Sequence, residues 1–381
     1  MTNFDEIVDR RGTGSLKWDK YRDRDVLPLW VADMDFRAPP EVTAALRSRA
    51  DHGVFGYTVP YPEVTDAVLD YLLTRHRVEA RAEWIVWLPG LVQGINLCCR
   101  AAGNSGDAVM TSTPVYPPFL SSPGFSDRRL ITVPLRLDGN VWNFDFDAME
   151  KSVTAETKLL ILCSPHNPVG RVWRRDELER VLEFCERHDL LLCSDEIHCD
   201  LILDDVPFVP TLSLGTRAAK RTITLLSPSK TYNLPGLSCA YAVIPDAQLR
   251  ARFKHVCRGI VTEVNAFGFT GCVAAYRHGE PWRRDLIAYL RASRDLVYKF
   301  FAAHLPQLKI APMEATYLAW FDARPLGVEN PHKLFEDHGV GLSNGNDFGA
   351  PGFLRLNFGC RRVMLLEGLE RMKRVCESVC R

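Results

Sequence analysis

The sequence has no excess of charge of either sign. Among its 381 residues, lysine plus arginine total 47 and aspartate plus glutamate also total 47, so the formal net charge is zero. No block of basic residues interrupts this balance. A neutral chain without such a block has no electrostatic attraction for nucleic acid or for an anionic membrane surface. We therefore expect no nucleic-acid partner and no membrane partner.

Long hydrophobic runs are also missing. The longest uninterrupted apolar run covers residues 239–244, whereas a helix needs roughly 20 apolar residues to cross a bilayer. Residues 1–6 include two acidic side chains, where a secretion signal would carry basic residues followed by an apolar stretch. These features predict a cytoplasmic protein.

The chain has no C-x-x-C pair, although it contains 12 cysteines. Structural zinc sites need ligands paired at short, repeated spacings, which this sequence does not offer. Single cysteines scattered through a long chain are typical of reduced thiols that pack as small hydrophobic residues in a cytosolic protein. We expect most of these cysteines to be buried and reduced.

In the middle of the chain, short apolar runs alternate with helical spacing. The runs at 159–163, 190–193 and 223–226 predict buried strands, and residues 178–185 repeat their apolar positions with helical spacing. Strands joined by crossover segments predict a mainly parallel sheet covered by helices on both faces, which is an α/β fold.

Polar residues follow each of these strands. Asn167 follows the first, Asp195 ends the second, and Lys230 follows the third. Because right-handed crossovers bring the carboxyl ends of parallel strands to one edge, we expect the three side chains to converge there. A lysine in a partly desolvated pocket has a lowered pKa and can act as a Schiff-base nucleophile.

Other residues have both a structural and a functional interpretation. The helix after Pro89-Gly90 could cradle a phosphate on its free N–H groups, or its glycine could simply form a turn. Asp195 could keep a heteroaromatic nitrogen protonated, cap a helix, or pair with an arginine. Tyr116 could stack on a flat cofactor or pack in the core. A metal site at Asp195, Glu196 and His198 lacks further ligands at suitable spacing, so we expect none.

The pattern of the chain changes after about residue 275. We expect an N-terminal arm over residues 1–45, a large domain over 46–275 and a smaller α+β domain over 276–381. The elements expected in the last part are a long helix at 282–304, strands at 317–321 and 353–358, a short helix at 332–338 and a final helix from 362.

Nine motifs, in order along nearly the whole chain, resemble those of pyridoxal-5′-phosphate (PLP) enzymes of fold type I. Within the class I/II aminotransferase family, they are most similar to the MalY/PatB group of cystathionine β-lyase-like C–S lyases. The motifs lie at 29–36, 55–57, 89–90, 113–119, 164–170, 194–198, 227–234, 315–320 and 353–358. The resemblance implies a mainly parallel seven-stranded sheet in the large domain.

The resemblance also implies roles for residues around the cofactor. Lys230 would form the Schiff base that holds PLP and would then remove the substrate Cα proton. Asp195 would pair with the pyridinium nitrogen and Asn167 would hydrogen-bond the phenolic oxygen. The remaining cofactor contacts would come from the Tyr116 ring, His198, Ser227 and the backbone of Val92 and Gln93.

The resemblance also implies which residues bind the substrate and which residue comes from a second subunit. Arg355 would grip the substrate α-carboxylate as a bidentate pair, with Asn167 and Ala32 beside it. Tyr57 would reach the phosphate from the neighbouring subunit of a homodimer and could act in catalysis. His198 stands where aminotransferases usually have tyrosine, as in the lyase group. Ser238 replaces an arginine of many aminotransferases, which leaves open what balances the phosphate charge.

The implied reaction is cleavage of an S-substituted L-cysteine, such as cystathionine, to a thiol, pyruvate and ammonia. One alternative is an aminotransferase on the same scaffold. Another is a biosynthetic enzyme that acts on a larger cysteine S-conjugate by decarboxylation or oxidation. A third is a PLP-bearing regulatory or binding protein with little turnover. The sequence leaves open which group the substrate sulfur carries.

Overall fold

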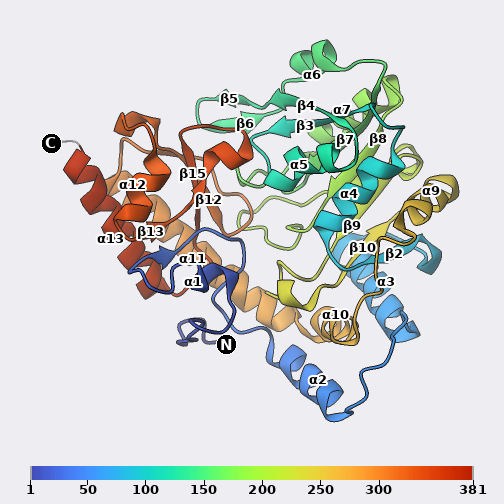
Figure 1. Ribbon diagram of the computed structural model, residues 1–381, viewed down its shortest axis with the longest axis horizontal. Helices are drawn as coiled ribbons and strands as arrows, with labels where there is room; N and C mark the ends of the chain where they lie inside the picture. The colour runs from blue at the N-terminus through green and yellow to red at the C-terminus, as the bar shows by residue number, and fades with distance from the viewer. Residues whose placement is uncertain (1, 380–381) are drawn as a thin grey trace.

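The computed structural model describes residues 2–379, and its larger part is built around a seven-stranded sheet (Figure 1). The strand order is β2-β10-β9-β8-β7-β3-β4. Only β10 runs against the others, because it pairs antiparallel with both β9 and β2 while the remaining pairs are parallel. The strands are β2 (Ile85–Leu88), β3 (Ala108–Thr113), β4 (Arg129–Pro134), β7 (Thr157–Cys163), β8 (Leu191–Asp195), β9 (Thr222–Leu226) and β10 (Ala240–Val243).

Both faces of this sheet are buried, as the continuous apolar runs predicted. In β7, Leu159 and Ile161 pack in one hydrophobic core with helix α4 (Leu91–Ala101). The alternate residues Leu160 and Leu162 pack in another core with helix α7 (Arg175–Arg187). Because side chains alternate along a strand, a strand apolar at every position is stable only between two covering layers.

The remaining helices of this part surround the sheet and extend from it. They are α2 (Pro40–Asp51), α3 (Pro62–His76), α5 (Pro117–Phe125), α6 (Phe146–Ser152), α8 (Thr216–Ala219), α9 (Ala247–Cys257) and α10 (Ala266–His278). A small hairpin of β5 (Arg136–Asp138) and β6 (Val141–Asn143) lies beyond β4.

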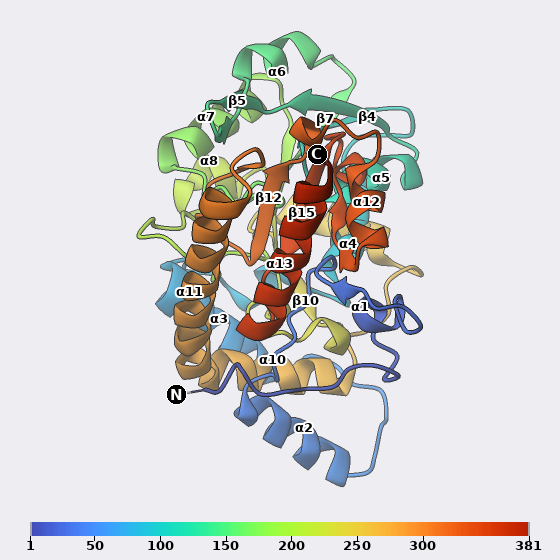
Figure 2. The ribbon, with the colours of Figure 1, turned by 90° about the vertical axis from the view of Figure 1, so that its left-hand side faces the viewer.

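The C-terminal part contains a four-stranded antiparallel sheet. Its order is β11-β12-β15-β14, with β11 (Lys309–Ile310), β12 (Leu318–Asp322), β15 (Phe353–Asn357) and β14 (Ser343–Asn344). Helices α11 (Glu280–His304) and α13 (Arg362–Val379) run side by side in front of β12 and β15 (Figure 2). The short helix α12 is Pro331–Asp337.

The three helices and two strands predicted for this C-terminal part are therefore present, within a few residues of their predicted bounds. The fold itself, a mostly parallel seven-stranded sheet with a smaller α+β part, is confirmed. The division of the chain at residues 45 and 275 stays a prediction.

The first residues form a segment that crosses the C-terminal part. After α1 (Leu16–Asp19), strand β1 (Leu27–Pro28) pairs in parallel with β13 (Val340–Gly341). Beyond β1, the segment at residues 31–36 reaches the carboxyl edge of the large sheet. Val31 and Ala32 in this segment line the cavity at that edge. This segment is part of the site as well as an arm.

The cysteines follow the expectation of buried thiols. The ten cysteines from Cys98 to Cys360 form no disulfide, and all are buried except Cys257, which is half-buried. Cys380 lies outside the described residues. Among residues 2–379, no helix has both the length and the apolar character that a membrane crossing needs.

Candidate active site

One cavity collects the carboxyl ends of five strands. Its volume is about 330 Å³, and the segments that follow β2, β3, β7, β8 and β9 all contribute to its wall. The predicted site residues in the wall are Ala32, Val92, Gln93, Tyr116, Asn167, Asp195, His198, Ser227, Lys230 and Arg355. The convergence of Asn167, Asp195 and Lys230 expected from the parallel topology is confirmed.

Lys230 stands four residues after β9 and is partly buried. Its Nζ donates to the backbone oxygen of Ala32 at 2.6 Å. Burial lowers the pKa of this amine to about 8, with Arg355 adding to the effect while Asp33 and Asp195 oppose it. A substantial fraction of the amine is therefore neutral near physiological pH, which is the form that attacks a carbonyl group.

Asp195 is the last residue of β8 and only 3% exposed. Its Oδ1 accepts one hydrogen bond, from the backbone N–H of Ile197 at 3.1 Å. Burial raises the pKa of this carboxyl group to about 7, although that hydrogen bond and the charge of Lys230 oppose the shift. A cationic ring nitrogen placed against it would return the group to its ionised form, so the residue fits a protonated pyridine.

The start of α4 provides unpaired backbone donors. No side chain caps this helix, and its first intrahelical hydrogen bond runs from Gly94 N to Gly90 O at 3.2 Å. The N–H groups of Leu91, Val92 and Gln93 therefore lack helical acceptors, and Val92 and Gln93 are exposed. A phosphate fits this end of the helix, where donors and the helix dipole both favour an anion.

Ser227 lies beside this helix end, and its hydroxyl group is engaged in the turn. It donates to Cys239 O at 2.8 Å and accepts from Ser229 N at 3.0 Å. A hydrogen bond from Ser227 to a phosphate therefore requires its hydroxyl proton to leave Cys239 O. Ser238 also lines the cavity, so the position at which the resemblance to aminotransferases would place an arginine does face the site.

Arg355 is a buried cation whose partners are all neutral. Its Nη1 donates to Asn167 Oδ1 at 2.9 Å, and its Nη2 donates to Trp30 O at 3.0 Å and Ser343 Oγ at 3.1 Å. Its Nε is buried without an acceptor, and burial lowers its pKa to about 10. Within residues 2–379 no carboxylate forms an ion pair with it, so this arginine is suited to an incoming anion.

Asn167 connects this arginine to the cofactor side of the cavity. Its side chain is 4% exposed, and its Oδ1 is taken by Arg355. The Nδ2 group is then the donor it can offer to an oxygen in the cavity, which is what a phenolate oxygen requires.

Tyr116 and His198 complete the wall. Tyr116 precedes the first residue of α5, and burial raises the pKa of its phenol. His198 is 3% exposed, and burial lowers its pKa to about 3, with Lys230 and Arg355 adding to the effect. Its imidazole is therefore neutral, and its Nδ1 is buried without a partner.

Tyr57 is the predicted residue that the chain does not bring to the cavity. It lies between α2 and α3, is fully exposed and is not part of the cavity wall. Its neighbours Val54, Phe55 and Val59 are also exposed, by 63–70%. Apolar side chains grouped in an exposed loop are typical of a surface that another chain covers.

Sequence reasoning missed the residues that hold Ala32 in place. Asn357 Nδ2 donates to Val31 O at 2.6 Å and to Asp33 O at 2.8 Å. Tyr317 donates to the same Ala32 oxygen as Lys230, at 2.9 Å. The motif at residues 29–36 is visible in the sequence, but nothing in one sequence shows that Asn357 and Tyr317 lie against it.

The residues of the cavity can hold PLP: an amine of lowered pKa, a buried carboxyl group without a cationic partner, and a helix start with free donors. Comparisons with known proteins agree. The chain is 38% identical to cystathionine beta-lyase PatB of Bacillus subtilis (strain 168), over 97% of this chain and 99% of that protein.

Solved structures show the same likeness. The crystal structure of OvoB superimposes with a TM-score of 0.96 at 46% identity, covering 99% of this chain and 100% of that one. Cystalysin from Treponema denticola, whose crystal structure contains PLP, superimposes with a TM-score of 0.94 at 32% identity, with 99% of both chains covered. The sequence model of the aminotransferase class I and II family matches residues 24–372. This chain therefore belongs to the aminotransferase class I and II family.

Proposed function

We propose that this protein is a PLP-dependent carbon–sulfur β-lyase that cleaves an S-substituted L-cysteine to a thiol, pyruvate and ammonia. The observation that carries the proposal is the single cavity that joins Lys230, Asp195 and the uncompensated Arg355. The likeness to PatB, a cystathionine β-lyase, over almost the whole chain supports the choice of reaction.

The residues proposed to hold PLP all line one cavity. Lys230 would bind it covalently, Asp195 would pair with the ring nitrogen, Asn167 would donate to the phenolic oxygen, and Tyr116 would stack on the ring. The phosphate would be held by the N–H groups of Val92 and Gln93 and by Ser227, and His198 would also contact the cofactor. When bound, PLP supplies an electron-withdrawing ring that stabilises the negative charge left at Cα after proton removal.

The chain's own residues then position the substrate and move its proton. Arg355 binds the α-carboxylate through its fork of donors, which fixes the Cα–H bond relative to Lys230. Because its pKa is lowered to about 8, Lys230 is more readily neutral near pH 7 than an exposed lysine and can accept the Cα proton. Ala32 lies beside the substrate, with its carbonyl oxygen accepting from Lys230.

The Cβ–S bond breaks after the proton has left Cα, and the electron pair leaves with sulfur as a thiolate. The thiolate needs a proton, and Lys230 then carries one; Tyr57 of the partner subunit is the other candidate donor. Water completes the conversion of the three-carbon fragment to pyruvate and ammonia. The proposed substrate is therefore an amino acid thioether.

A homodimer is part of this proposal. The loop at residues 52–61 carries Tyr57 and three exposed apolar side chains, and in the dimer it would reach the phosphate end of the neighbouring cavity. The cations that line the cavity are Lys230 and Arg355, and both have other tasks. With Ser238 at the family's arginine position, the start of α4 would therefore carry most of the phosphate charge. Light scattering of the purified protein measures the subunit number. We also propose a cytoplasmic location, consistent with the unbridged thiols.

An aminotransferase is the second candidate, because the family match includes that activity and both reactions begin with removal of the Cα proton. The deciding experiment supplies cysteine thioethers, from S-methyl to bulky conjugates, without any keto acid. Steady release of pyruvate and thiol supports the lyase. A single turnover that stops until a keto acid is added contradicts it.

A further inference from the structure

A second cavity, which we call the rear cavity, lies outside the proposed active site. Its volume is about 650 Å³, and it is formed by the end of α3, the loop at residues 199–208 and the first half of α11. Five arginines line it, and the acidic residues in its wall are Asp204 and Asp205. The arginines are Arg75, Arg77, Arg283, Arg284 and Arg291.

Two of these arginines are neutralised by neighbouring acids. Arg75 Nε lies 2.9 Å from Asp200 Oδ1, and Arg283 Nε lies 2.7 Å from Glu280 Oε2. On the acidic side, Asp204 pairs with Arg294, which is not part of the cavity wall. These pairs hold the cavity wall together, and Arg294 also pairs with Asp295 at 2.9 Å, so its positive charge is shared between two acids.

The other three arginines have no close acidic partner among the described residues. Within residues 2–379, the side chain of Arg77 forms no ion pair or hydrogen bond, and the side chain of Arg291 donates only to Leu203 O at 2.6 Å. Arg284 Nε is 3.9 Å from Glu280 Oε1, an oxygen that Arg283 also contacts. Asp205 is the one acid of the cavity wall without an ion pair to a described residue, so unpaired arginines outnumber unpaired acids there and the wall is positively charged.

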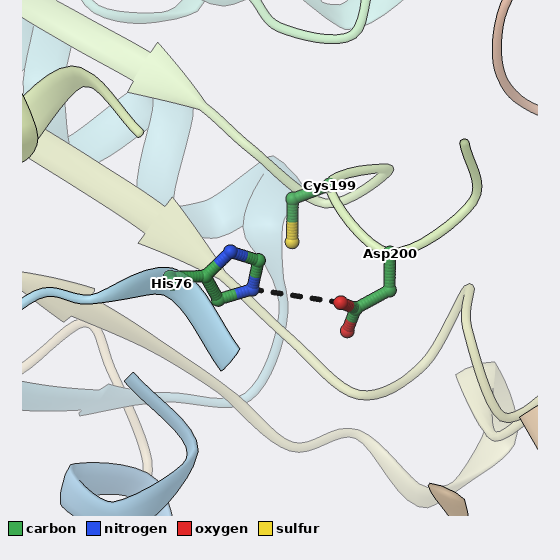
Figure 3. A group of neighbouring side chains, drawn as sticks. All are labelled: His76, Cys199 and Asp200. Carbon is green, nitrogen blue, oxygen red and sulfur yellow. Dashed lines mark ion pairs between the residues drawn. The ribbon is translucent and has the colours of Figure 1, made fainter. Parts of the chain in front are cut away.

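A metal ion is the alternative occupant, because His76, Cys199 and Asp200 present their ligand atoms to one another here (Figure 3). Both oxygens of Asp200 are already used, however: Arg75 binds Oδ1 at 2.9 Å and Tyr71 donates to Oδ2 at 2.7 Å. A divalent cation would have to displace that guanidinium group. The charge of the site therefore favours an anion.

We propose that the rear cavity binds a small oxyanion with two or more negative charges, of the phosphate class. Guanidinium groups present paired donors that match phosphate oxygens, and the excess charge of the wall would be neutralised by a dianion. The volume is in the range of small-molecule sites, roughly 300–1,000 Å³. Arg77, Arg284 and Arg291 would be the principal ligands.

The two cavities share a wall. Ile197 and His198 line the proposed active site, and the next residue, Cys199, lines the rear cavity. Arg283 Nη1 also donates to Asp200 O at 3.1 Å, which joins α11 to this turn. An anion bound by α11 would therefore act on the turn that carries His198, and the absorbance of the bound cofactor should report it.

The test uses the holoenzyme, so that the cofactor's own phosphate occupies the start of α4. Inorganic pyrophosphate is titrated by calorimetry at constant ionic strength set with sodium chloride. We expect saturable binding at one site per chain, with a rise in melting temperature. The double variant Arg77→Gln, Arg291→Gln should weaken binding about tenfold or more. Arg252→Gln, on the exposed face of α9, is the matched control and should leave binding unchanged.

A gain-of-affinity variant guards against a loss caused by misfolding. Asp205→Asn removes the unpaired acid and should strengthen pyrophosphate binding about two- to fivefold. Equal binding by the double variant and the control overturns the proposal, and so does binding seen only without cofactor. A response to chloride as strong as to pyrophosphate, or binding of an acidic peptide while pyrophosphate is inert, also overturns it.

Discussion

Two groups of buried charges lie on the two sides of residues 31–36, and they are organised in opposite ways. On the outer side, Arg10 pairs with Asp33 and with Asp35 at 2.5 and 2.7 Å, and Lys17 pairs with Asp35 at 2.8 Å. Burial works to raise the pKa of Asp35, but Lys17, Trp18 and Arg10 together hold it below its usual value. Two cations and two acids balance.

On the inner side, the charges do not balance. In the cavity wall, Lys230 and Arg355 are accompanied by one carboxyl group, Asp195, whose pKa is raised to about 7 by burial. Asp33 also acts on the charge of Lys230, but it lies outside that wall and is paired with Arg10. Burial lowers the pKa of both cations, to about 8 and about 10. Buried charges that find partners within the chain serve the fold, whereas buried charges without partners indicate where a ligand must complete the site.

The largest effect is expected from removing the amine on the inner side. Lys230→Ala should abolish the yellow colour of the holoenzyme and lower turnover by about 10³-fold or more, because nucleophile and base are lost together. Absorbance and pyruvate release measure the two effects. Lys220→Ala, at an exposed lysine that follows α8 and lies outside the cavity wall, is the control. A coloured, active Lys230→Ala enzyme contradicts the assignment.

The second effect is a loss of substrate affinity when Arg355, the buried arginine without a carboxylate partner, is replaced. Arg355→Lys should lower kcat/KM by about 10²-fold, mainly through KM, because an ammonium group cannot bind a carboxylate as a planar fork. The cofactor spectrum should stay intact, since Arg355 contacts the substrate in our proposal. Thioether kinetics beside a spectrum of each variant give the measurement. An unchanged KM would mean that the α-carboxylate binds elsewhere.

Much of the inner side could be predicted from the sequence, because its residues follow buried strands. Asn167, Asp195 and Lys230 each come within four residues of a strand end, and parallel topology brings such ends together. The position of Arg355 between two leucines on a predicted strand also indicated burial. These inferences needed only local patterns and one rule of topology.

The position of residues 31–36 could not be predicted, because the contacts that fix it join residues far apart in the sequence. Asn233 Nδ2 donates to Met34 O at 2.9 Å across 199 residues, and Asn357 reaches Val31 across 326 residues. One sequence shows neither pairing, so residues 1–45 read as an arm, and only the family resemblance places Ala32 near the substrate. The role proposed for Tyr57 requires a second chain, and it too came from the resemblance.

The third effect is a loss of stability when a cation is removed from the balanced ion pairs on the outer side. Lys17→Met should destabilise the protein by about 3–5 kcal/mol, because it leaves the buried Asp35 with less compensating charge. Lys17 is only 1% exposed, so water cannot replace the lost ammonium group. Urea unfolding of the cofactor-free protein measures the change, with Lys20→Met, an exposed neighbour, as control. A loss below about 1 kcal/mol would show that Arg10 alone suffices for Asp35.

The smallest effect is expected for the same substitution at Lys230, which should raise the free energy of unfolding where Lys17→Met lowers it. In the cofactor-free protein, Lys230→Met should increase stability by about 1–3 kcal/mol at pH 7, because it removes a cation whose pKa burial lowers to about 8. The unfolded chain holds that proton up to about pH 10.5, so wild-type stability should rise with pH between about 8 and 10.5 as the folded amine loses its charge. The advantage of the variant should therefore shrink over the same window. If the same substitution destabilises at both Lys17 and Lys230 by equal amounts, the contrast between balanced and unbalanced charges is wrong.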